Sequence, residues 1–401
     1  MARQLRTQVA IIGAGPAGLM LGALLARRGV DSVILEARSR DYIERRIRAG
    51  VLEQGSVDAM HEVGAGERMR AHGLVHDGTI LRFAGRSHRI DFRALTGKAV
   101  TIYSQHELVC DLVAHRLAAG APLAFEVDDV RLGDVATARP TVRYRHAGDE
   151  VELACDAVAG CDGFHGVARA AIPADRLRVF ERDYPYGWLG ILADVAPSSH
   201  ELVYAHHDRG FALLSMRSPE VSRLYLQCAP DEDLAAWSDD RIWSELALRL
   251  GADDFTLRRG PITQRSVTPM RSFVAEPMRH GRLALAGDAA HIVPPTGAKG
   301  LNLAIADVRL LADAFAALCT RGDDRLLDAY SATCLRRVWK VERFSAWMTQ
   351  LLHRADEPGD NAATAAFRDR LQRAELDYVT SSRAAATTLA ENYVGLPLVD
   401  A

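Results

Sequence analysis

The chain has 401 residues, of which 49 are basic and 52 acidic, so its formal net charge is −3. This length and balance predict a soluble enzyme of two or three domains, and they point to neither a nucleic-acid partner nor a membrane. The six cysteines form no CxxC pair, so we expect buried free thiols in a reducing cytoplasm and no metal site.

The first predicted elements are a strand, a tight glycine turn and a helix. Gly13, Gly15 and Gly18 lie in the run VAIIGAGPAG at residues 9–18. In a dinucleotide-binding turn the first glycine makes the bend, the second lets the backbone approach a pyrophosphate, and the third lets the helix pack on the strand. Free N–H groups at the helix N-terminus then favour the anion. Glu36 ends a second predicted strand and has the spacing of a carboxylate that binds ribose hydroxyls.

The same stretch invites a different interpretation. Residues 9–26 carry no charge, which on that ground alone would suit a signal peptide or a membrane span. Four glycines and Pro16 break the run into a strand and a helix, and Gly29 follows as a helix C-cap. We therefore interpret it as the start of a nucleotide-binding domain in a cytoplasmic protein.

The domain organisation follows from the order of strand and helix patterns. Strands alternate with helices up to about Ile172, which predicts a parallel sheet with helical crossovers, but residues 76–92 and 179–268 have an antiparallel pattern. We predict an α/β fold in which a Rossmann-like domain carries an inserted antiparallel β-sheet substrate domain and C-terminal helices. The predicted boundaries are 1–75, 98–178 and 269–330 for the nucleotide-binding domain, 76–97 and 179–268 for the substrate domain, and 331–401 for the helical region.

Two further strand ends combine an acid with a glycine. Asp288 follows the run RLALAG at 282–287, and a helix is predicted to start near Gly300. An aspartate there suits a ribityl hydroxyl, and the helix start would direct N–H dipoles at the N1–C2=O edge of a flavin. Helix capping is the simpler interpretation of Asp288 alone. Asp162, in AGCDGFH at 159–165, ends another strand that can approach a pyrophosphate.

A predicted hairpin in the inserted sheet gathers four polar side chains on one face. If residues 218–222 form its loop, Arg217 lies opposite Arg223 and Ser215 lies opposite Tyr225. A guanidinium fork, a hydroxyl and a phenol would converge on one small anion, and arginine matches a carboxylate with paired bonds. From the strands alone, a solvated polar face is the simpler interpretation.

In this order the motifs resemble the FAD-dependent aromatic hydroxylases, single-component flavoprotein monooxygenases with one Rossmann-like FAD domain. The resemblance runs nearly end to end and is carried by IRAGVLEQ at 47–54, GCDGFHG at 160–166, GDAAHIVPPTGAKGLNLA at 287–304 and AENYVGLP at 390–397. It implies FAD held without a covalent bond, a homodimer, and NADPH as a transient co-substrate, with NADH as the alternative. No second GxGxxG follows a strand, which agrees with a transient nicotinamide.

The activity that the resemblance implies is hydroxylation of 4-hydroxybenzoate at C3 to protocatechuate, using NADPH and O2 through a C4a-hydroperoxyflavin. Because a phenolate attacks an electrophilic oxygen far faster than a phenol does, deprotonation of the 4-hydroxyl is the activating step. Two alternatives stay open: the same mechanism on a related hydroxy- or aminobenzoate, and a substrate-triggered NADPH oxidase or flavin-binding sensor without productive hydroxylation.

The resemblance also implies residue roles. For the substrate carboxylate they are Ser215, Arg217 and Tyr225. At the phenol end they are Tyr204, the Pro295 carbonyl, and a proton relay through Tyr393 and His76. Taken alone, each of the two tyrosines is more simply interpreted as an ordinary buried tyrosine, and the histidine as a surface residue in a loop. The positions around FAD are Gly13, Gly15, Gly18, Glu36, Arg46, Arg48, Gln105, Asp162, Arg223, Asp288, Leu301 and Asn302.

The nicotinamide side is the part in which the chain departs from its relatives. The positions that match the family's around NADPH are Arg46, Arg48, His165, Arg169 and Arg271, to which we add Arg38 and Tyr42 as expected NADPH contacts. The loop at residues 37–44 is of a type that varies between NADPH- and NADH-preferring members. Arg38 and Tyr42 would favour a 2′-phosphate and Glu44 would oppose it, and we expect NADPH.

Overall fold

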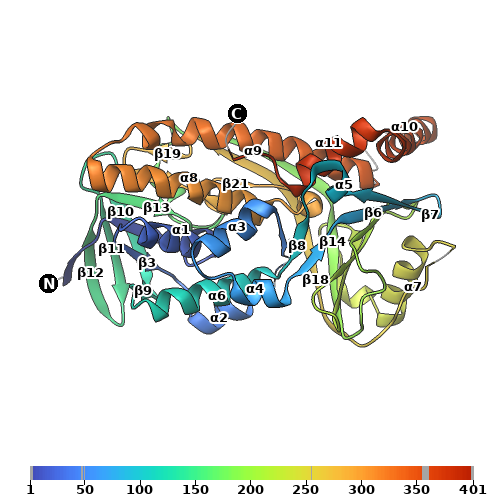
Figure 1. The fold of residues 1–401 in the computed structure, drawn as a ribbon, viewed down its shortest axis with the longest axis horizontal. Helices are drawn as coiled ribbons and strands as arrows, with labels where there is room; N and C mark the ends of the chain where they lie inside the picture. Colours follow the sequence, from blue (N-terminus) through green and yellow to red (C-terminus); the bar gives the residue numbers. More distant parts are fainter. Residues whose placement is uncertain (1–2, 47, 49, 254, 355–360, 399–401) are drawn as a thin grey trace.

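The computed structural model describes residues 3–46, 48, 50–253, 255–354 and 361–398. One half is built on a six-stranded sheet whose strand order is β19-β20-β13-β2-β3-β9 (Figure 1). Its strands are β19 (Arg279–His280), β20 (Leu283–Leu285), β13 (Ala157–Gly160), β2 (Val9–Ile12), β3 (Ser32–Leu35) and β9 (Leu123–Ala124). All pair in parallel except β19, which confirms the Rossmann-like prediction for this part.

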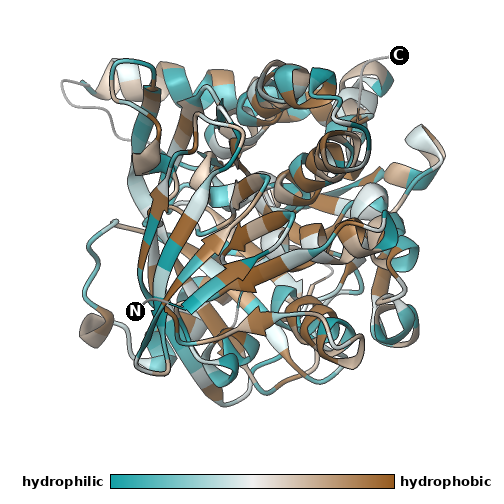
Figure 2. Ribbon diagram, turned by 90° about the vertical axis from the view of Figure 1, so that its left-hand side faces the viewer, coloured by the Kyte–Doolittle hydropathy of each residue, from teal (hydrophilic) through white to brown (hydrophobic). Residues whose placement is uncertain are grey.

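Helices pack against this sheet as a layer in which one helix lies against β2 and β3 and contacts the two others. The main ones are α1 (Pro16–Arg27), α6 (Gln105–Ala118) and α8 (Gly300–Arg321), and shorter ones are α2 (Arg40–Arg45), α3 (Gln54–Glu62) and α4 (Glu67–His72). Helix α1 ends before Gly29, whose φ of +69° is the left-handed conformation expected just after a helix. Apolar strands lie in the interior and polar segments at the periphery (Figure 2).

The predicted alternation of strands and helices up to Ile172 is wrong for one stretch. Strands β10 (Asp128–Gly133), β11 (Thr141–His146) and β12 (Asp149–Ala154) form an antiparallel meander, and β1 (Arg3–Arg6) adds to it in parallel. A tight turn at Ala147–Gly148, both with positive φ, connects β11 to β12, and the loop of residues 134–140 connects β10 to β11, so neither connection contains a helix.

The inserted sheet is confirmed and is larger than predicted, and it is antiparallel except where residues 203–205 pair in parallel with residues 80–82. Its eight strands follow the order β21-β18-β14-β17-β16-β15-β6-β7. Their bounds are β21 (His291–Ile292), β18 (Ile262–Glu276), β14 (Arg178–Ala193), β17 (Ser222–Cys228), β16 (Ala212–Met216), β15 (Val203–Ala205), β6 (Gly78–Phe83) and β7 (Arg86–Asp91). Strand β18 continues past residue 268, so one long strand joins the two halves (Figure 1).

Both faces of this sheet are covered. Helix α7 (Asp239–Arg249) packs behind it against one apolar cluster. A second cluster joins the opposite face to the C-terminal helices α9 (Arg325–Leu352), α10 (Ala362–Ser381) and α11 (Arg383–Val394), and to α5 (Phe92–Thr96). A small sheet of β4 (Val51–Leu52), β8 (Val100–Ile102) and β5 (Leu74–His76) borders this second cluster. The candidate substrate site lies on the face toward the C-terminal helices.

Within the described ranges, no helix is long and apolar enough to cross a membrane. All six cysteines are free thiols. The remaining short elements are the 3-10 turns η1 (Arg169–Ala171), η2 (Leu234–Ala236), η3 (Gly287–Ala289) and η4 (Pro295–Gly297).

Candidate active site

The turn between β2 and α1 has three glycines, each with its own geometric reason. Gly13 has φ of +100°, and a Cβ there would lie 2.4 Å from the Cys161 carbonyl oxygen. A Cβ on Gly18 would lie 1.9 Å from the Gly13 carbonyl oxygen. A Cβ on Gly15 would meet no protein atom within 4 Å, and no side chain caps α1. The open space above Gly15, at an uncapped helix N-terminus, therefore fits a phosphate.

Glu36 directly follows β3 and faces this turn. Its Oε2 accepts a hydrogen bond from the Ala14 N–H and its Oε1 accepts one from the Arg38 N–H, each at 2.8 Å. These bonds fix the carboxylate, and each oxygen keeps a lone pair for a ribose hydroxyl.

Two aspartates lie at the neighbouring strand ends. Asp162 Oδ2 accepts from the Ala168 N–H at 2.8 Å, whereas its Oδ1 is buried without a partner. Burial raises the pKa of Asp162. Asp288 lies in η3, is about half exposed, and has Arg48 Nη1 at 4.0 Å. A buried, unpaired carboxylate oxygen calls for a donor, which a ligand hydroxyl or a water can supply.

The remaining predicted flavin positions lie at the start of a helix or just beyond its end. Gln105 is the first residue of α6, and Leu301 lies in the first turn of α8, which has no side-chain cap. The Asn302 amide already bonds to the protein, because its Oδ1 accepts from the Glu53 N–H and the Ser56 hydroxyl. A role for Asn302 toward a flavin would therefore use its backbone N–H. Arg46 is exposed just beyond α2.

The predicted hairpin exists, but its predicted register is wrong by two residues. Ser215 pairs with Arg223, and Leu213 pairs with Tyr225. The loop is shorter than expected because the Arg217 N–H bonds to the Val221 carbonyl at 2.8 Å. An even shift keeps the same faces together, so the four polar residues still share one face.

The same face also carries the tyrosine expected at the phenol end. Tyr204 in β15 pairs with Leu213, which pairs with Tyr225, so the three form one row across neighbouring strands. Two strand spacings separate the backbones of Tyr204 and Tyr225, about 10 Å. The row therefore sets two polar ends at a fixed separation, with apolar Leu213 between them.

Two guanidinium groups crowd the Tyr225 end. Arg223 Nε donates to the Tyr225 hydroxyl, and Arg223 Nη1 is buried without a partner. Arg217 donates to the Arg48 carbonyl oxygen at 2.8 Å, and its Nη2 contacts His106 Nδ1 at 2.7 Å. Burial and the neighbouring Arg223 charge lower the pKa of Arg217 to about 10. Like charges gathered in this way favour an anion between them.

At the other end, the hydroxyl groups of Tyr204 and Tyr393 lie 2.6 Å apart, and both residues are buried. Burial raises the pKa of both phenols, so both are protonated and one must donate to the other. The Pro295 carbonyl accepts from the Ala298 N–H at 2.9 Å and keeps one lone pair.

His76 differs from the expectation of a surface loop residue. It ends β5 and is buried, and both of its ring nitrogens lack a hydrogen-bond partner. No direct hydrogen bond joins His76 to Tyr393, so the predicted relay through these two residues would need a bridging group and stays a prediction. Burial lowers the pKa of His76 to about 4.

The predicted NADPH residues fall into separate groups. The Arg38 guanidinium lies 5.4 Å from the centre of the exposed Tyr42 ring, while Glu44 is paired with Arg40 at 2.7 Å. Glu44 therefore opposes a 2′-phosphate less than expected. Arg169 and Arg271 both lie over the Phe164 ring, beside His165. Arg169 is held by the Ala289 and Phe164 carbonyls, so its terminal nitrogens are largely used.

Sequence reasoning missed three groups that the structure brings together. Lys299, Glu53 and Arg337 form a buried ionic cluster beside Tyr393. Lys299 and Glu53 lie within two of the motifs that carry the family resemblance, at 287–304 and 47–54. A charged residue in each of these motifs was a signal that could have indicated a buried ion pair. Arg337 lies in an ordinary amphipathic helix and carried no such signal.

The fold and these strand ends define a flavoprotein with a dinucleotide-binding turn. A model of the FAD binding domain family matches residues 6–345, so the chain belongs to this family of FAD-binding proteins. It is 49% identical over 395 residues to the p-hydroxybenzoate hydroxylase of Acinetobacter baylyi, covering 98% of this chain and 96% of that protein. It is 28% identical to the 6-methylpretetramide 4-monooxygenase of Streptomyces rimosus, covering 84% of this chain and 81% of the other.

Solved structures with the same fold include the p-nitrophenol 4-monooxygenase of Pseudomonas putida, with a TM-score of 0.80 and 20% identity over 98% of this chain and all of that one. The anhydrotetracycline hydroxylase of Streptomyces rimosus has a TM-score of 0.75 and 23% identity, covering 97% of this chain and 76% of the other. At this level of identity, these two similarities support the fold.

Proposed function

We propose that the protein is an FAD-dependent monooxygenase that hydroxylates 4-hydroxybenzoate at C3, consuming NADPH and O2. One observation carries the proposal: a single sheet face has Tyr204, which contacts the buried Tyr393 of α11, at one end and an arginine, serine and tyrosine cluster at the other. A ring with a phenol and a carboxylate in para positions matches both ends. The 49% identity to a p-hydroxybenzoate hydroxylase supports the same substrate.

At the carboxylate end, we assign Arg217 as the main partner of the substrate, assisted by Ser215 and Tyr225. Arg217 would leave the Arg48 carbonyl or His106 to make paired bonds to a carboxylate. The anion would also relieve the repulsion between Arg217 and Arg223, which adds to its binding.

At the phenol end, we assign Tyr204 to the substrate hydroxyl and Tyr393 to the next step of the relay. Their 2.6 Å contact gives a proton that leaves the substrate a path away from the ring. His76 completes the relay if a water links it to Tyr393, and its two unpaired ring nitrogens support such a water. The Pro295 carbonyl keeps a lone pair for the same substrate hydroxyl.

The residues described above fit FAD. Gly13, Gly15 and Gly18 would hold the pyrophosphate and Glu36 the ribose, while Asp162 and Asp288 would accept hydrogen bonds from ribityl hydroxyls or ordered waters. When bound, FAD supplies the two-electron redox chemistry and the activation of oxygen. We further propose that Arg38 and Tyr42 make NADPH preferred over NADH, which a comparison of kcat/KM for the two nucleotides tests. A cytoplasmic homodimer, as in the family, is also part of the proposal.

A panel of ring substrates tests the proposed function. Purified protein with NADPH is incubated separately with 4-hydroxybenzoate, 4-aminobenzoate and 3-hydroxybenzoate, and the products are identified by mass spectrometry. We expect 3,4-dihydroxybenzoate from the first compound at the highest kcat/KM. A higher value for another ring would assign the site to that substrate, and NADPH oxidation without any hydroxylated ring would support an oxidase or sensor.

A further inference from the structure

A buried ionic cluster holds the backbone at the end of α11. Lys299 Nζ donates to Glu53 Oε1 at 2.6 Å and to the Tyr393 carbonyl oxygen at 2.7 Å. Arg337 Nη2 donates to Glu53 Oε2 at 3.1 Å. All three side chains are buried, so these bonds operate away from water. Glu53 thereby connects two cations, one of which holds the backbone of Tyr393.

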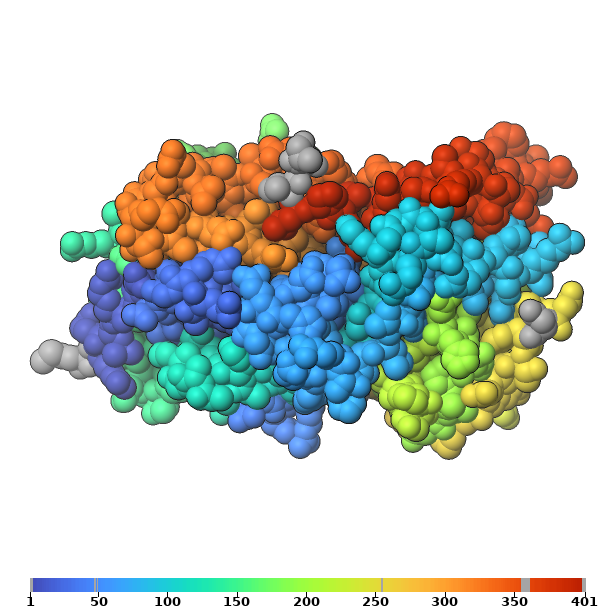
Figure 3. Space-filling view, in the orientation of Figure 1, coloured from blue at the N-terminus to red at the C-terminus, as the bar shows by residue number. Residues whose placement is uncertain are grey.

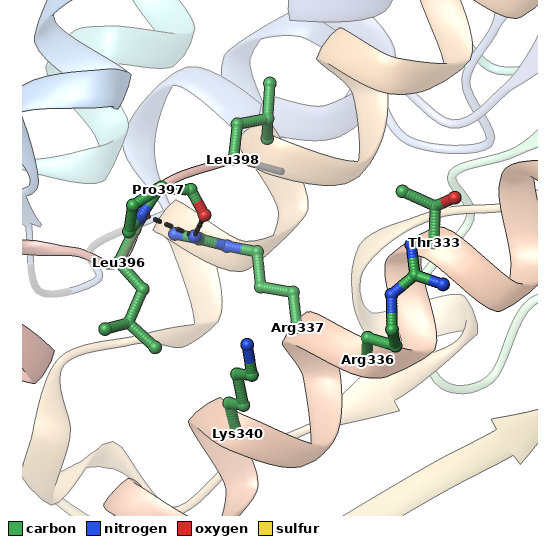
Figure 4. Close-up of a pocket in the computed structure, with 7 residues that line it drawn as sticks. All are labelled: Thr333, Arg336, Arg337, Lys340, Leu396, Pro397 and Leu398. Atoms are coloured by element: carbon green, nitrogen blue, oxygen red, sulfur yellow. Dashed lines mark hydrogen bonds between the residues drawn. The ribbon is translucent and has the colours of Figure 1, made fainter. Parts of the chain in front are cut away.

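Arg337 also holds the chain that follows α11. Its Nη1 donates to the carbonyl oxygens of Leu396 and Pro397, at 2.6 and 2.8 Å (Figure 4). This C-terminal segment, coloured red, crosses the molecular surface between α9 and the N-terminal half (Figure 3). Between the two anchoring points lies Gly395, with φ of +104°, and a Cβ there would be 2.2 Å from Glu53 Oε2. The segment therefore lies directly on the Glu53 carboxylate.

From this arrangement we infer that Arg337 is a positioning residue for Tyr393. Lys299 holds the carbonyl of Tyr393, and Arg337 holds the chain three and four residues further on, with Glu53 fixing both cations. The Tyr393 side chain cannot then shift away from Tyr204 without moving the clamped segment. The catalytic consequence rests on the proposed function, whereas the clamp itself does not.

The planar guanidinium is what makes this role possible. One arginine here reaches three acceptors on two different chain segments, in directions fixed by its fork. A lysine at 337 would keep the positive charge but has a single nitrogen, so it cannot hold Glu53 and both carbonyls together. A lysine variant therefore separates an effect of charge from an effect of position.

The test uses the full FAD-loaded protein in four variants. Arg337→Met removes the clamp, Arg337→Lys keeps its charge, and deletion of residues 396–401 removes its acceptors while keeping Arg337. Arg336→Met is the matched control, because Arg336 is the exposed neighbour on the same helix and lines the same groove (Figure 4). Hydrogen exchange of the amides of residues 393–395, which all four variants keep, and product formed per NADPH are measured for each.

We expect amide exchange at 393–395 to be about tenfold faster in Arg337→Met, which corresponds to about 1.4 kcal/mol. Product per NADPH should fall while the 4-hydroxybenzoate Kd stays within about twofold, because the carboxylate end is untouched. Arg337→Lys should resemble Arg337→Met, and Arg336→Met should resemble the parent protein. The deletion should have the same effect as Arg337→Met, and the two changes together should be no worse than either alone.

Unchanged exchange in Arg337→Met would overturn the clamp. Faster exchange with full coupling would overturn its link to Tyr393, and complete rescue by Arg337→Lys would show that only charge matters. If Arg337→Met fails to retain FAD, the deletion variant decides, since it leaves the buried cluster intact. A parent protein that forms no product would refute the proposed function, and the exchange measurements would still decide the clamp.

Discussion

The hydroxyl oxygens of Tyr204 and Tyr393 lie 2.6 Å apart, although 189 positions separate the two residues in the chain. Tyr204 is fixed because β15 is paired on both sides, with β6 and β16. Tyr393 is fixed by stacking on Phe92 at 4.9 Å and by Lys299 at its carbonyl. Two protonated phenols held in this way form a path for a proton through an otherwise apolar cluster.

Replacement of Tyr204 by Phe should uncouple the reaction. The variant keeps the carboxylate partners, so 4-hydroxybenzoate should still bind and stimulate NADPH oxidation. Without the Tyr204 hydroxyl the bound phenol loses its proton acceptor and remains a poor nucleophile. Product per NADPH should fall well below that of the parent protein, with hydrogen peroxide making up the difference, as measured by chromatography and a peroxide assay.

Tyr330→Phe is the matched control, since Tyr330 is equally buried and its hydroxyl donates to the Leu285 carbonyl, outside the substrate cluster. It should remain coupled. A fully coupled Tyr204→Phe enzyme in which bound 4-hydroxybenzoate still ionises would remove Tyr204 from the relay.

The three glycines of the first turn should respond differently to alanine. Gly15→Ala meets no protein atom, so the protein should fold normally, but its methyl group would enter the phosphate site and weaken FAD binding. Gly18→Ala places a Cβ 1.9 Å from the Gly13 carbonyl oxygen, so it should lower the stability of the flavin-free protein as well. Thermal unfolding of both apoproteins and flavin titration check this. Equal FAD affinity for Gly15→Ala and the parent would place the pyrophosphate elsewhere.

Arg217→Lys should weaken binding of 4-hydroxybenzoate while the fold and flavin are retained. Loss of a charge-assisted pair costs about 1.5–3 kcal/mol, or roughly tenfold to somewhat over a hundredfold in Kd. Titration of the flavin spectrum with substrate measures the change. The control is Arg86→Lys, at the exposed end of β7, which should bind as the parent does. An Arg217→Lys Kd equal to that of the parent would assign the carboxylate to other residues.

His76 should make stability depend on pH. Its pKa is lowered from 6.5 to about 4 by burial, so between these values the unfolded chain binds more protons than the native one. The free energy of unfolding should therefore fall as pH drops from 6.5 towards 4, by up to about 1.4 kcal/mol per pH unit from this group. Urea unfolding at several pH values should give a shallower dependence of the free energy of unfolding on pH for His76→Asn than for the parent, and His146→Asn, at an exposed position, is the control. An equal slope for His76→Asn would show that His76 is protonated in the native protein.

Local features were predictable because a short stretch of sequence determines them. The β2-turn-α1 unit and Gly29 follow from glycine geometry and helix endings. The hairpin loop was expected over five residues, but Ser218 accepts hydrogen bonds from the Glu220 and Val221 N–H groups and closes a shorter one. Alternation along a strand fixes the face but not the register, so the face of Ser215 was predicted correctly and its partner was not.

Long-range contacts had no comparable signal. Tyr204 and Tyr393 were associated only through the resemblance to a family, because nothing local connects them. The pairs of Lys299 and Arg337 with Glu53 span 246 and 284 positions, and no spacing rule covers such distances. The burial of His76 was missed because three residues of β5 are too short for a strand pattern.

The most direct test of the account is the origin of the oxygen in the product. The FAD-loaded protein is supplied with NADPH and 4-hydroxybenzoate under 18O2, and the ring product is analysed by mass spectrometry alongside NADPH consumption. We expect 3,4-dihydroxybenzoate with a single 18O atom, in a ratio to NADPH close to one. NADPH consumption that yields labelled hydrogen peroxide and unchanged 4-hydroxybenzoate would contradict the assignment of this protein as a hydroxylase of that substrate.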